Sequence, residues 1–442
     1  ATNPVPTSQP PAPPAPTATA TNTTVPNIIV NTLTDELNNN GNCSLREAIK
    51  AANTNLPVDA CIPTGGSDTI TFSVNGTITM GIGGVGEDAG ITGDYDITES
   101  LTVIGNGAAN TIISGNSVDR LFHILGGTVS LSEMTISNGA PGGEGGGVHV
   151  NAGSLTITNS TIKSNTATAN GGGIYVNTGA SLTVSGGTIG GSGVGNTGSL
   201  GGGIYTKGPT TISGALIEDN TANGGGGGGI QTAGGTTNIQ TTTIKKNKGN
   251  DAGGGIHVAT GGTVNVSKSA IDQNSLTATG NGGGVYNEDS FTAKETSITA
   301  NTASVGTSNG GGLYNNAGTA TLKNVTISNN TASGSGGGFK VVGGIVQANN
   351  VTIAYNSAPN SVGGGIHVDA TGALEIGNTI LSDNSALGVV ECDLGGGTVT
   401  DKDHNLIHNS STCGFSGANN ITGSSANLAA LAGSTPAYHA LN

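Results

Sequence analysis

The chain has 442 residues, of which 80 are glycine, 3% are aromatic and only 9% are charged. This composition argues against a core of large side chains, and equally against disorder, which goes with high charge and few β-branched residues. The net charge of −14 and the presence of only two arginines argue against nucleic acid as a partner, because phosphate contacts need clustered Lys and Arg.

Two further observations concern where the chain works. No apolar run approaches the ~18 residues of a membrane span, so we expect no membrane span. A first residue of Ala rather than Met fits a mature chain from which a signal peptide has been removed. Both observations favour a secreted protein.

Residues 1–26 (ATNPVPTSQPPAPPAPTATATNTTVP) contain no core-forming pattern. Their proline and threonine content predicts an extended, polyproline-like tail or linker. Residues 27–66 are different and predict an N-terminal cap made of a strand followed by a helix. The strand is expected at residues 27–35. In the helix, Leu45, Ala48, Ile49 and Ala52 share one face, and Ser44 with Glu47 forms the pattern of a capping box.

The four cysteines form two local pairs, Cys43 with Cys61 and Cys392 with Cys413. We interpret them as two disulfides formed in an oxidising compartment, one near each end of the chain. A metal site is the alternative, but neither pair has the CxxC spacing or the neighbouring histidines that such a site favours.

A glycine-rich acidic stretch follows the first cap. Its GGVGED segment resembles one unit of a calcium β-roll, although such rolls are built from tandem copies. A solvated acidic loop is the default interpretation, and Ca²⁺ is the one cofactor that the sequence suggests. The acids of the stretch are Glu87, Asp88, Asp94, Asp96 and Glu99, and the first four are the candidate metal ligands.

The strongest signal is a repeat over residues 67–390. Gly-Gly-Gly followed by an apolar residue recurs nine times at spacings of 26 to 30 residues, which marks a solenoid. Each repeat continues with an alternating β pattern and then a turn rich in Asn, Thr, Ser and Ala. Because identical residues recur only after a full period, each strand can pair in register with its counterpart in the next coil. Stacked turn asparagines, among them Asn165, Asn220, Asn274, Asn301, Asn330, Asn356 and Asn384, can then form hydrogen-bonded ladders.

The sequence therefore predicts an all-β, right-handed parallel β-helix with a short N-terminal capping helix. A β-propeller is the structural rival, but its blades need about 40 residues and carry aromatic signatures that are missing here.

After each Gly-Gly-Gly, the apolar residue points inward and the next residue points outward. The outward positions concentrate tyrosine and histidine on what we expect to be one exposed stripe. A docking face for glycans or a neighbouring subunit is one interpretation, and the ordinary β-propensity of tyrosine on a solvated strand is the other. The aromatic members of this stripe are His149, Tyr175, Tyr205, His257, Tyr286, Tyr314 and His367.

Enzymes that cleave acidic polysaccharides on this kind of fold need carboxylates for Ca²⁺ and a basic group to take a proton. Arg120, beside Asp119 and His123, is the one candidate base outside the cap. Acids within the repeats do not recur at one position, so stacking does not gather them as a hydrolase requires. We therefore expect no catalytic residues and no enzymatic activity.

Residues 391–442 are expected to form the last coils and a C-terminal cap. A second acidic cluster lies here, next to the second cysteine pair, and we expect it to be a surface loop. Its members are Glu391, Asp393, Asp401 and Asp403, with His404 and His408.

The string CSLREAI at residues 43–49, the second cysteine and GSDTITF at residues 66–72 resemble the N-terminal module of bacterial CSLREA-domain proteins. Those are secreted or surface proteins with right-handed parallel β-helices, similar to the repeats of polymorphic outer-membrane proteins and pectin-lyase-like folds. Asn405, Cys413 and the stretch from Leu428 to Ala440 match as well, so the resemblance spans residues 27–442.

The leading functional hypothesis is an extracellular structural protein that binds copies of itself and forms a filament or surface layer through its tail and rod ends. The alternative is a monomeric adhesin or glycan-binding rod that uses the stripe. A polysaccharide lyase or hydrolase is the third hypothesis.

Overall fold

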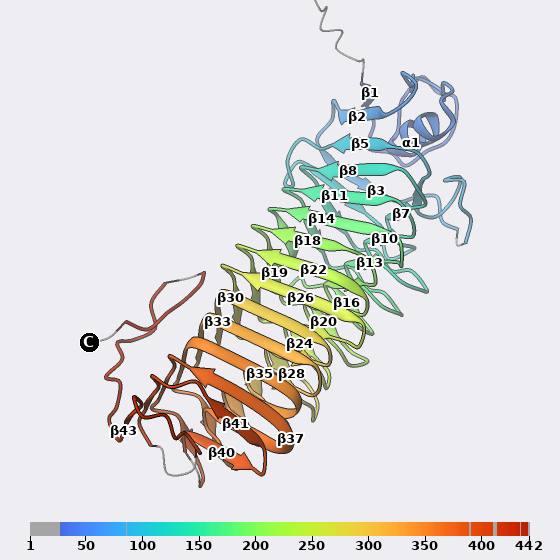
Figure 1. Cartoon of the computed structure of the whole chain (residues 1–442). Helices are drawn as coiled ribbons and strands as arrows, with labels where there is room; N and C mark the ends of the chain where they lie inside the picture. The colour runs from blue at the N-terminus through green and yellow to red at the C-terminus, as the bar shows by residue number, and fades with distance from the viewer. Residues whose placement is uncertain (1–26, 85, 389, 410–412, 434, 441–442) are drawn as a thin grey trace, which may run out of the picture.

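The computed structural model describes residues 27–84, 86–388, 390–409, 413–433 and 435–440. It confirms the predicted parallel β-helix, in which the chain winds into a rod of stacked coils with the single described helix at its N-terminal end (Figure 1). The predicted tail of residues 1–26 lies outside the described residues. In the described part of the chain, no helix is long and apolar enough to cross a membrane.

Each coil contributes a short strand to each of three parallel ladders, and neighbouring strands pair in register from coil to coil. The first ladder runs through β4 (Tyr95–Ile97), β7 (Phe122–Ile124), β10 (Val148–Val150), β13 (Ile174–Val176), β17 (Ile204–Thr206), β21 (Ile230–Thr232), β25 (Ile256–Val258), β29 (Val285–Asn287), β32 (Leu313–Asn315), β35 (Phe339–Ala354), β37 (Ile366–Gly377) and β40 (Cys392–Gly395). It contains the strands that follow Gly-Gly-Gly in the repeats, together with β4, β7 and β40 at its ends.

The second ladder holds the alternating segment of each repeat. It runs through β1 (Ile28–Val30), β2 (Asp68–Phe72), β5 (Leu101–Ile104), β8 (Thr128–Ser132), β11 (Ser154–Thr158), β14 (Ser181–Ser185), β18 (Thr210–Ser213), β22 (Gly235–Gln240), β26 (Gly262–Ser267), β30 (Ser290–Thr299), β33 (Thr319–Ser328), β35, β37 and β41 (Thr398–Asp401).

The third ladder follows the second after a sharp corner, where residues such as Asn159, Asn324 and Asn350 have left-handed φ values of 47° to 56°. It runs through β3 (Gly76–Thr79), β6 (Thr111–Ser114), β9 (Thr135–Ser137), β12 (Thr161–Lys163), β15 (Thr188–Gly190), β19 (Leu216–Glu218), β23 (Thr243–Lys245), β27 (Ala270–Asp272), parts of β30, β33 and β35, β38 (Ile380–Ser382), β42 (Leu406–Ile407) and β43 (Ile421–Thr422).

A short fourth ladder of eight two-residue strands closes the coils from Thr197 to Ala386. It consists of β16 (Thr197–Gly198), β20 (Thr221–Ala222), β24 (Lys248–Gly249), β28 (Ser275–Leu276), β31 (Thr302–Ala303), β34 (Thr331–Ala332), β36 (Ser357–Ala358) and β39 (Ser385–Ala386).

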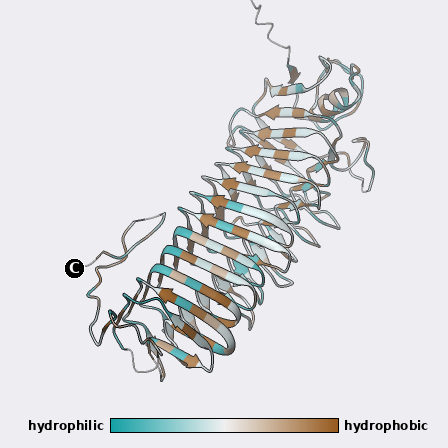
Figure 2. Cartoon of the chain, in the orientation of Figure 1, coloured by the Kyte–Doolittle hydropathy of each residue, from teal (hydrophilic) through white to brown (hydrophobic). Residues whose placement is uncertain are grey.

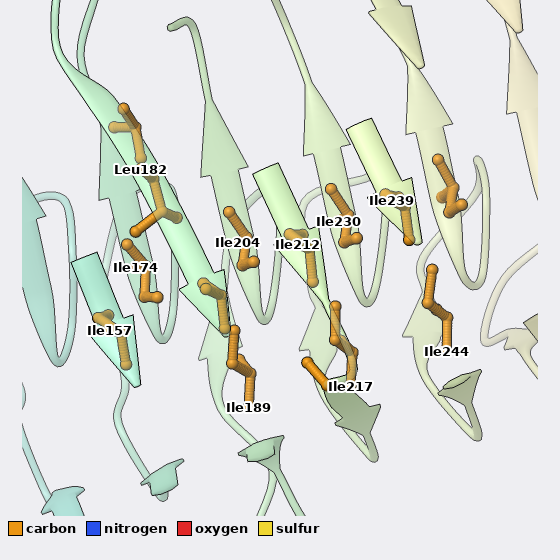
Figure 3. Close-up of a cluster of buried hydrophobic side chains, with 14 of the residues drawn as sticks. Ile157, Ile174, Leu182, Ile189, Ile204, Ile212, Ile217, Ile230, Ile239 and Ile244 are labelled. Carbon is orange, nitrogen blue, oxygen red and sulfur yellow. The ribbon is translucent and has the colours of Figure 1, made fainter. Parts of the chain in front are cut away.

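The core is a column of β-branched and leucine side chains that point inward from these ladders (Figure 3). Ile174, Ile204 and Ile230 stack on one another in the first ladder, and each is fully buried. Apolar and polar residues alternate along many strands of the rod (Figure 2). The period-two pattern of the sequence therefore separates an apolar interior from a polar surface.

The Gly-Gly-Gly motif is required by close backbone contacts between coils. Gly171 has a φ of +70°, and a Cβ atom on Gly172 would lie 2.4 Å from the carbonyl oxygen of Gly202 in the next coil. A Cβ atom on Gly173 would lie 2.6 Å from the oxygen of Gly203. Any side chain at these positions would push the coils apart, which explains why the motif recurs in every repeat.

The predicted asparagine ladder is confirmed, and it is buried. Each Nδ2 atom before Asn384 donates to the Oδ1 atom of the asparagine in the next coil at 2.9–3.0 Å and to an isoleucine carbonyl of the preceding coil. Asn196 and Asn247 belong to the ladder as well. They were missed because an irregular 30-residue repeat and a lysine-rich turn conceal the pattern, although each asparagine directly precedes a strand of the fourth ladder.

The N-terminal cap is built as predicted around α1 (Leu45–Thr54), where Ser44 and Glu47 form a capping box. The apolar face of α1 is buried against the first coils. Arg46 lies on the same helix and is also buried, and its guanidinium donates to both carboxylate oxygens of Asp35 at 2.8 and 3.0 Å. It also donates to the carbonyl oxygens of Gly90 and Gly93, so the cap holds the acidic stretch that contains these glycines in place.

At the other end, the segment after β43 turns back along the side of the rod (Figure 1). The hydroxyl of Tyr355 donates to the carbonyl of Leu428 at 3.2 Å. Further along, the N–H of Ala437 donates to Ser297 Oγ at 3.1 Å, two coils nearer the N-terminus than Tyr355. This segment therefore covers part of the third ladder instead of adding a coil.

Candidate functional site

The outward positions of the first ladder form a continuous column of twelve polar or aromatic side chains, each the register partner of the next. Several rings are in direct contact, with Tyr175 and Tyr205 stacked at a centroid distance of 5.4 Å and Tyr286 and Tyr314 at 5.3 Å. We call this column the ladder face. Its members are Asp96, His123, His149, Tyr175, Tyr205, Gln231, His257, Tyr286, Tyr314, Lys340, His367 and Asp393.

The expectation that this stripe is exposed is wrong. Tyr175, Tyr205, Tyr314 and His367 are buried, while His149, His257 and Tyr286 are partly buried. Two causes act together. The rings cover one another along the column, and the loops that precede each Gly-Gly-Gly line the face from the side. Those loops have no fixed length or period, so no pattern in the sequence indicates that they cover the stripe.

A hollow of about 460 Å³ lies in the middle of the ladder face, between loops of successive coils. Gln231, His257 and Tyr286 form its floor, and Asp251 and Glu288 add carboxylates at its rim. Gln231 is buried, and its Oε1 atom has no hydrogen-bond partner. The Nδ1 atom of His257 is also buried without a partner, while its Nε2 atom lies 3.4 Å from Glu288 Oε2. The contact with His257 lowers the pKa of Glu288.

The acidic stretch at the N-terminal end of the ladder face divides into groups with different partners. Glu87 accepts hydrogen bonds from the backbone N–H groups of Ala89, Ile91 and Thr92, which lower its pKa although burial opposes them. This carboxylate therefore closes its own loop.

Asp94 is also engaged, because its Oδ2 atom lies 2.8 Å from Arg120 Nε. Burial, together with the charge of Asp96, raises the pKa of Asp94 to about 7 despite this arginine. Arg120 also contacts His149 Nδ1 at 2.7 Å, and burial together with the arginine charge lowers the pKa of His149 to about 3. Arg120 is thus an ion-pair partner of Asp94 within the described structure.

Asp88 and Asp96 remain, and both approach His123 Nδ1. The distance is 3.5 Å from Asp88 Oδ1 and 3.2 Å from Asp96 Oδ1. The three ligand atoms lie within 4.8 Å of one another. Of the four candidate metal ligands, the structure therefore brings Asp88 and Asp96 together. It adds His123, which the sequence had suggested only as a neighbour of Arg120.

The second acidic cluster does not form one site. Glu391 is buried against Asn384, whereas Asp393 lies 2.8 Å from His367 Nδ1 on the ladder face. Asp401 accepts from the backbone of Ser416 and Gly417, and these bonds hold the loop in place. Asp403 lies in the same loop and His404 is exposed, while His408 Nδ1 lies 3.2 Å from Asp383. Both predicted disulfides, Cys43–Cys61 and Cys392–Cys413, are present.

The two ends of the rod carry strands with a partner on one side only. At the N-terminal end, β1 pairs with β2 alone among the described strands, and Ile29 and Ile62 are 53% and 58% exposed beside a hollow of about 480 Å³. At the C-terminal end, β41 pairs only with β37 among the described strands. Leu387 and Ile421 are exposed there.

Comparison with known proteins gives the same fold. No curated protein matches the chain. Among solved structures, ORF18 of Geobacillus virus E2 is similar over 86% of this chain at 11% identity and a TM-score of 0.28, and the match spans 60% of the length of the viral protein. A family model described as a right handed beta helix region matches residues 120–344, just over half of the chain. The chain therefore belongs to the right-handed β-helix family.

Proposed function

We propose that this chain is an extracellular structural subunit that assembles end to end into a filament or surface layer. The observation that carries this proposal is that β1 at one end of the rod and β41 at the other each have a described partner strand on one side only. An unpaired edge of a parallel ladder offers its backbone N–H and C=O groups to a further strand.

All strands of the ladders run in the same direction, so the last coil of one copy matches the polarity of the first coil of another. Such a head-to-tail contact is heterologous, and its repetition along the rod axis produces a filament and not a closed ring. The exposed apolar residues at the ends, Ile29 and Ile62 on one side and Leu387 and Ile421 on the other, would be buried by the same contact.

Other features support the extracellular setting. Two disulfides are typical of proteins from oxidising compartments. The resemblance of residues 43–49 to CSLREA modules favours the same setting. Residues 1–26 lie outside the described structure, and their role as a connecting arm stays a prediction.

Electron microscopy of the purified full chain tests the proposal. We expect filaments whose thickness matches one rod, and we expect Ile29→Lys and Ile421→Lys each to abolish them, because charge at an edge strand blocks further pairing. Val305→Lys is the matched control, since Val305 is 36% exposed in a loop on the side of the rod. Discrete rods in the unmodified protein would contradict the proposal. Removal of residues 1–26 tests separately whether the tail contributes to filament formation.

Glycan binding on the ladder face is the second candidate, favoured by the hollow around Gln231 and His257. The carboxylates of Asp251 and Glu288 could accept hydrogen bonds from sugar hydroxyls while the Tyr286 ring provides a stacking surface. Screening the protein against a glycan panel would test it. A genuine hit should be lost in Asp251→Ala and retained in Ile29→Lys, whereas a hit that survives Asp251→Ala lies elsewhere.

A further inference from the structure

We propose that Asp88, Asp96 and His123 form a binding site for a divalent transition-metal ion of the zinc class at the N-terminal end of the ladder face. The inference is independent of assembly and of glycan binding. It also differs from the calcium loop that the sequence suggested, because the ligand set contains an imidazole nitrogen and omits Glu87 and Asp94.

The three side chains lie close enough together to bind one ion. Asp96 on β4 and His123 on β7 are register partners in adjacent coils, and Asp88 reaches them from the loop before β4. An ion bound at about 2.0–2.1 Å by tetrahedral ligands places those ligands about 3.3 Å apart. The observed separations of His123 Nδ1 from the two carboxylate oxygens, 3.2 and 3.5 Å, agree with that spacing.

The second argument comes from a comparison within the same ladder. His367 also contacts two aspartates, but Asp369 lies 2.7 Å from its Nε2 atom and Asp393 lies 2.8 Å from its Nδ1 atom. There each nitrogen of the imidazole faces a carboxylate of its own. At His123 both carboxylates face the same nitrogen, which carries at most one proton. One cation placed between the three atoms satisfies all of them.

The third argument is the charge balance around Asp96. Its side chain is completely buried, and a buried carboxylate is costly unless it is paired. The two nearby arginines are already engaged, Arg46 with Asp35 and Arg120 with Asp94. In the described part of the chain, no lysine or arginine forms an ion pair with Asp88 or Asp96.

The surroundings also orient the ligands. The N–H of Gly90 donates to Asp96 Oδ2 at 2.9 Å, which leaves Oδ1 directed at His123. Arg46 in turn holds the carbonyls of Gly90 and Gly93, so the buried cap fixes the loop that carries Asp88. Hydrogen bonds of this kind behind the ligands are typical of metal sites. Asp88 is 69% exposed, so the site opens to solvent and has room for water as a further ligand.

Isothermal titration of the chelator-treated full chain with Zn²⁺ tests the site, with Co²⁺ as a spectroscopic probe of coordination. We expect one ion per chain and a visible absorption spectrum typical of Co²⁺ with a low coordination number. We expect the affinity to fall at least tenfold in Asp96→Asn and in His123→Gln. Asp88→Asn provides the same test at an exposed position where folding is not at risk. His367→Gln is the matched control and should bind like the unmodified protein.

Three outcomes would overturn the proposal. The first is no saturable Zn²⁺ binding by the unmodified chain. The second is unchanged affinity in Asp88→Asn, which would place the ion elsewhere. The third is tighter binding of Ca²⁺ than of Zn²⁺, which would contradict the role of the imidazole.

Discussion

Asn384 Nδ2 donates to Glu391 Oε2 at 2.7 Å, so the buried asparagine ladder ends on a carboxylate at the C-terminal end of the rod. Every earlier Nδ2 group of the ladder finds an amide oxygen in the next coil, and Glu391 provides the acceptor for the last one. Burial raises the pKa of Glu391, although the hydrogen bonds from Asn384 partly oppose this effect.

This raised pKa predicts a pH dependence of stability. A carboxyl whose pKa is higher in the folded than in the unfolded state stabilises the fold below its ordinary pKa, and that contribution is lost as the pH rises through the folded value. Glu391→Gln keeps an acceptor for Asn384 without ionising. We therefore expect its melting temperature, measured by calorimetry, to exceed that of the unmodified protein at pH 8 and to match it at pH 4. Glu375→Gln, on a partly exposed site of β37, should leave the difference between the two pH values unchanged.

The interior of the asparagine ladder supplies the second prediction. Asn274→Ala removes the acceptor of Asn247 and the donor to the carbonyl of Ile244, and both groups are buried. Because each buried unsatisfied group costs about 1–3 kcal/mol, we expect the free energy of unfolding to fall by about 3 kcal/mol. Asn265→Ala removes a similar bond between coils, to Asn238 at 2.9 Å, but on the exposed surface. Its effect in chemical denaturation should stay below about 0.5 kcal/mol, and equal losses in both variants would argue against a special role for the buried ladder.

The ladders show which features the sequence could predict. The inward apolar residue of each Gly-Gly-Gly segment and the outward residue after it follow from strand alternation, and Asn274 and Asn301 stack because they recur with the coil. Periodic positions bring identical residues together, so their contacts can be read from the repeat length.

Aperiodic contacts could not be predicted in this way. Arg46 meets Asp35, Gly90 and Gly93 across long stretches of chain that share no repeat. His123 joins Asp88 and Asp96 only because a loop of irregular length folds over the first coils. The burial of Tyr175 and Tyr205 likewise depends on loops that do not recur at a fixed period. The composition of those loops does not indicate which way they fold.

The buried pair of Arg46 and Asp35 gives the third prediction. Arg46→Met leaves Asp35 buried without its cation and frees the carbonyls of Gly90 and Gly93. Removal of one partner of a buried ion pair costs about 3–5 kcal/mol, whereas replacing both partners is much less costly. We therefore expect Arg46→Met to destabilise the cap strongly and the double variant Asp35→Asn with Arg46→Met to recover part of the loss. Hydrogen exchange of residues 27–66, compared in the three proteins, measures the effect, and an equally weakened double variant would contradict the pairing argument.

The two disulfides give the fourth prediction, which concerns the ends of the rod separately. Cys43 lies just before α1 and is joined to Cys61 in the segment after the helix. Cys392 in β40 is joined to Cys413 in the loop beyond β42. Each disulfide closes a loop of about twenty residues, for which the loss of the cross-link costs about 3 kcal/mol. Because a solenoid couples only neighbouring coils, this cost should remain local.

We expect Cys43→Ala with Cys61→Ala to accelerate hydrogen exchange in α1 and β1, and Cys392→Ala with Cys413→Ala to do so in β40 to β42. The central coils from β14 to β30 should exchange at the same slow rate in both variants. Faster exchange throughout the rod in either variant would show that the coils unfold as one cooperative unit and that the ends are not independent of the centre.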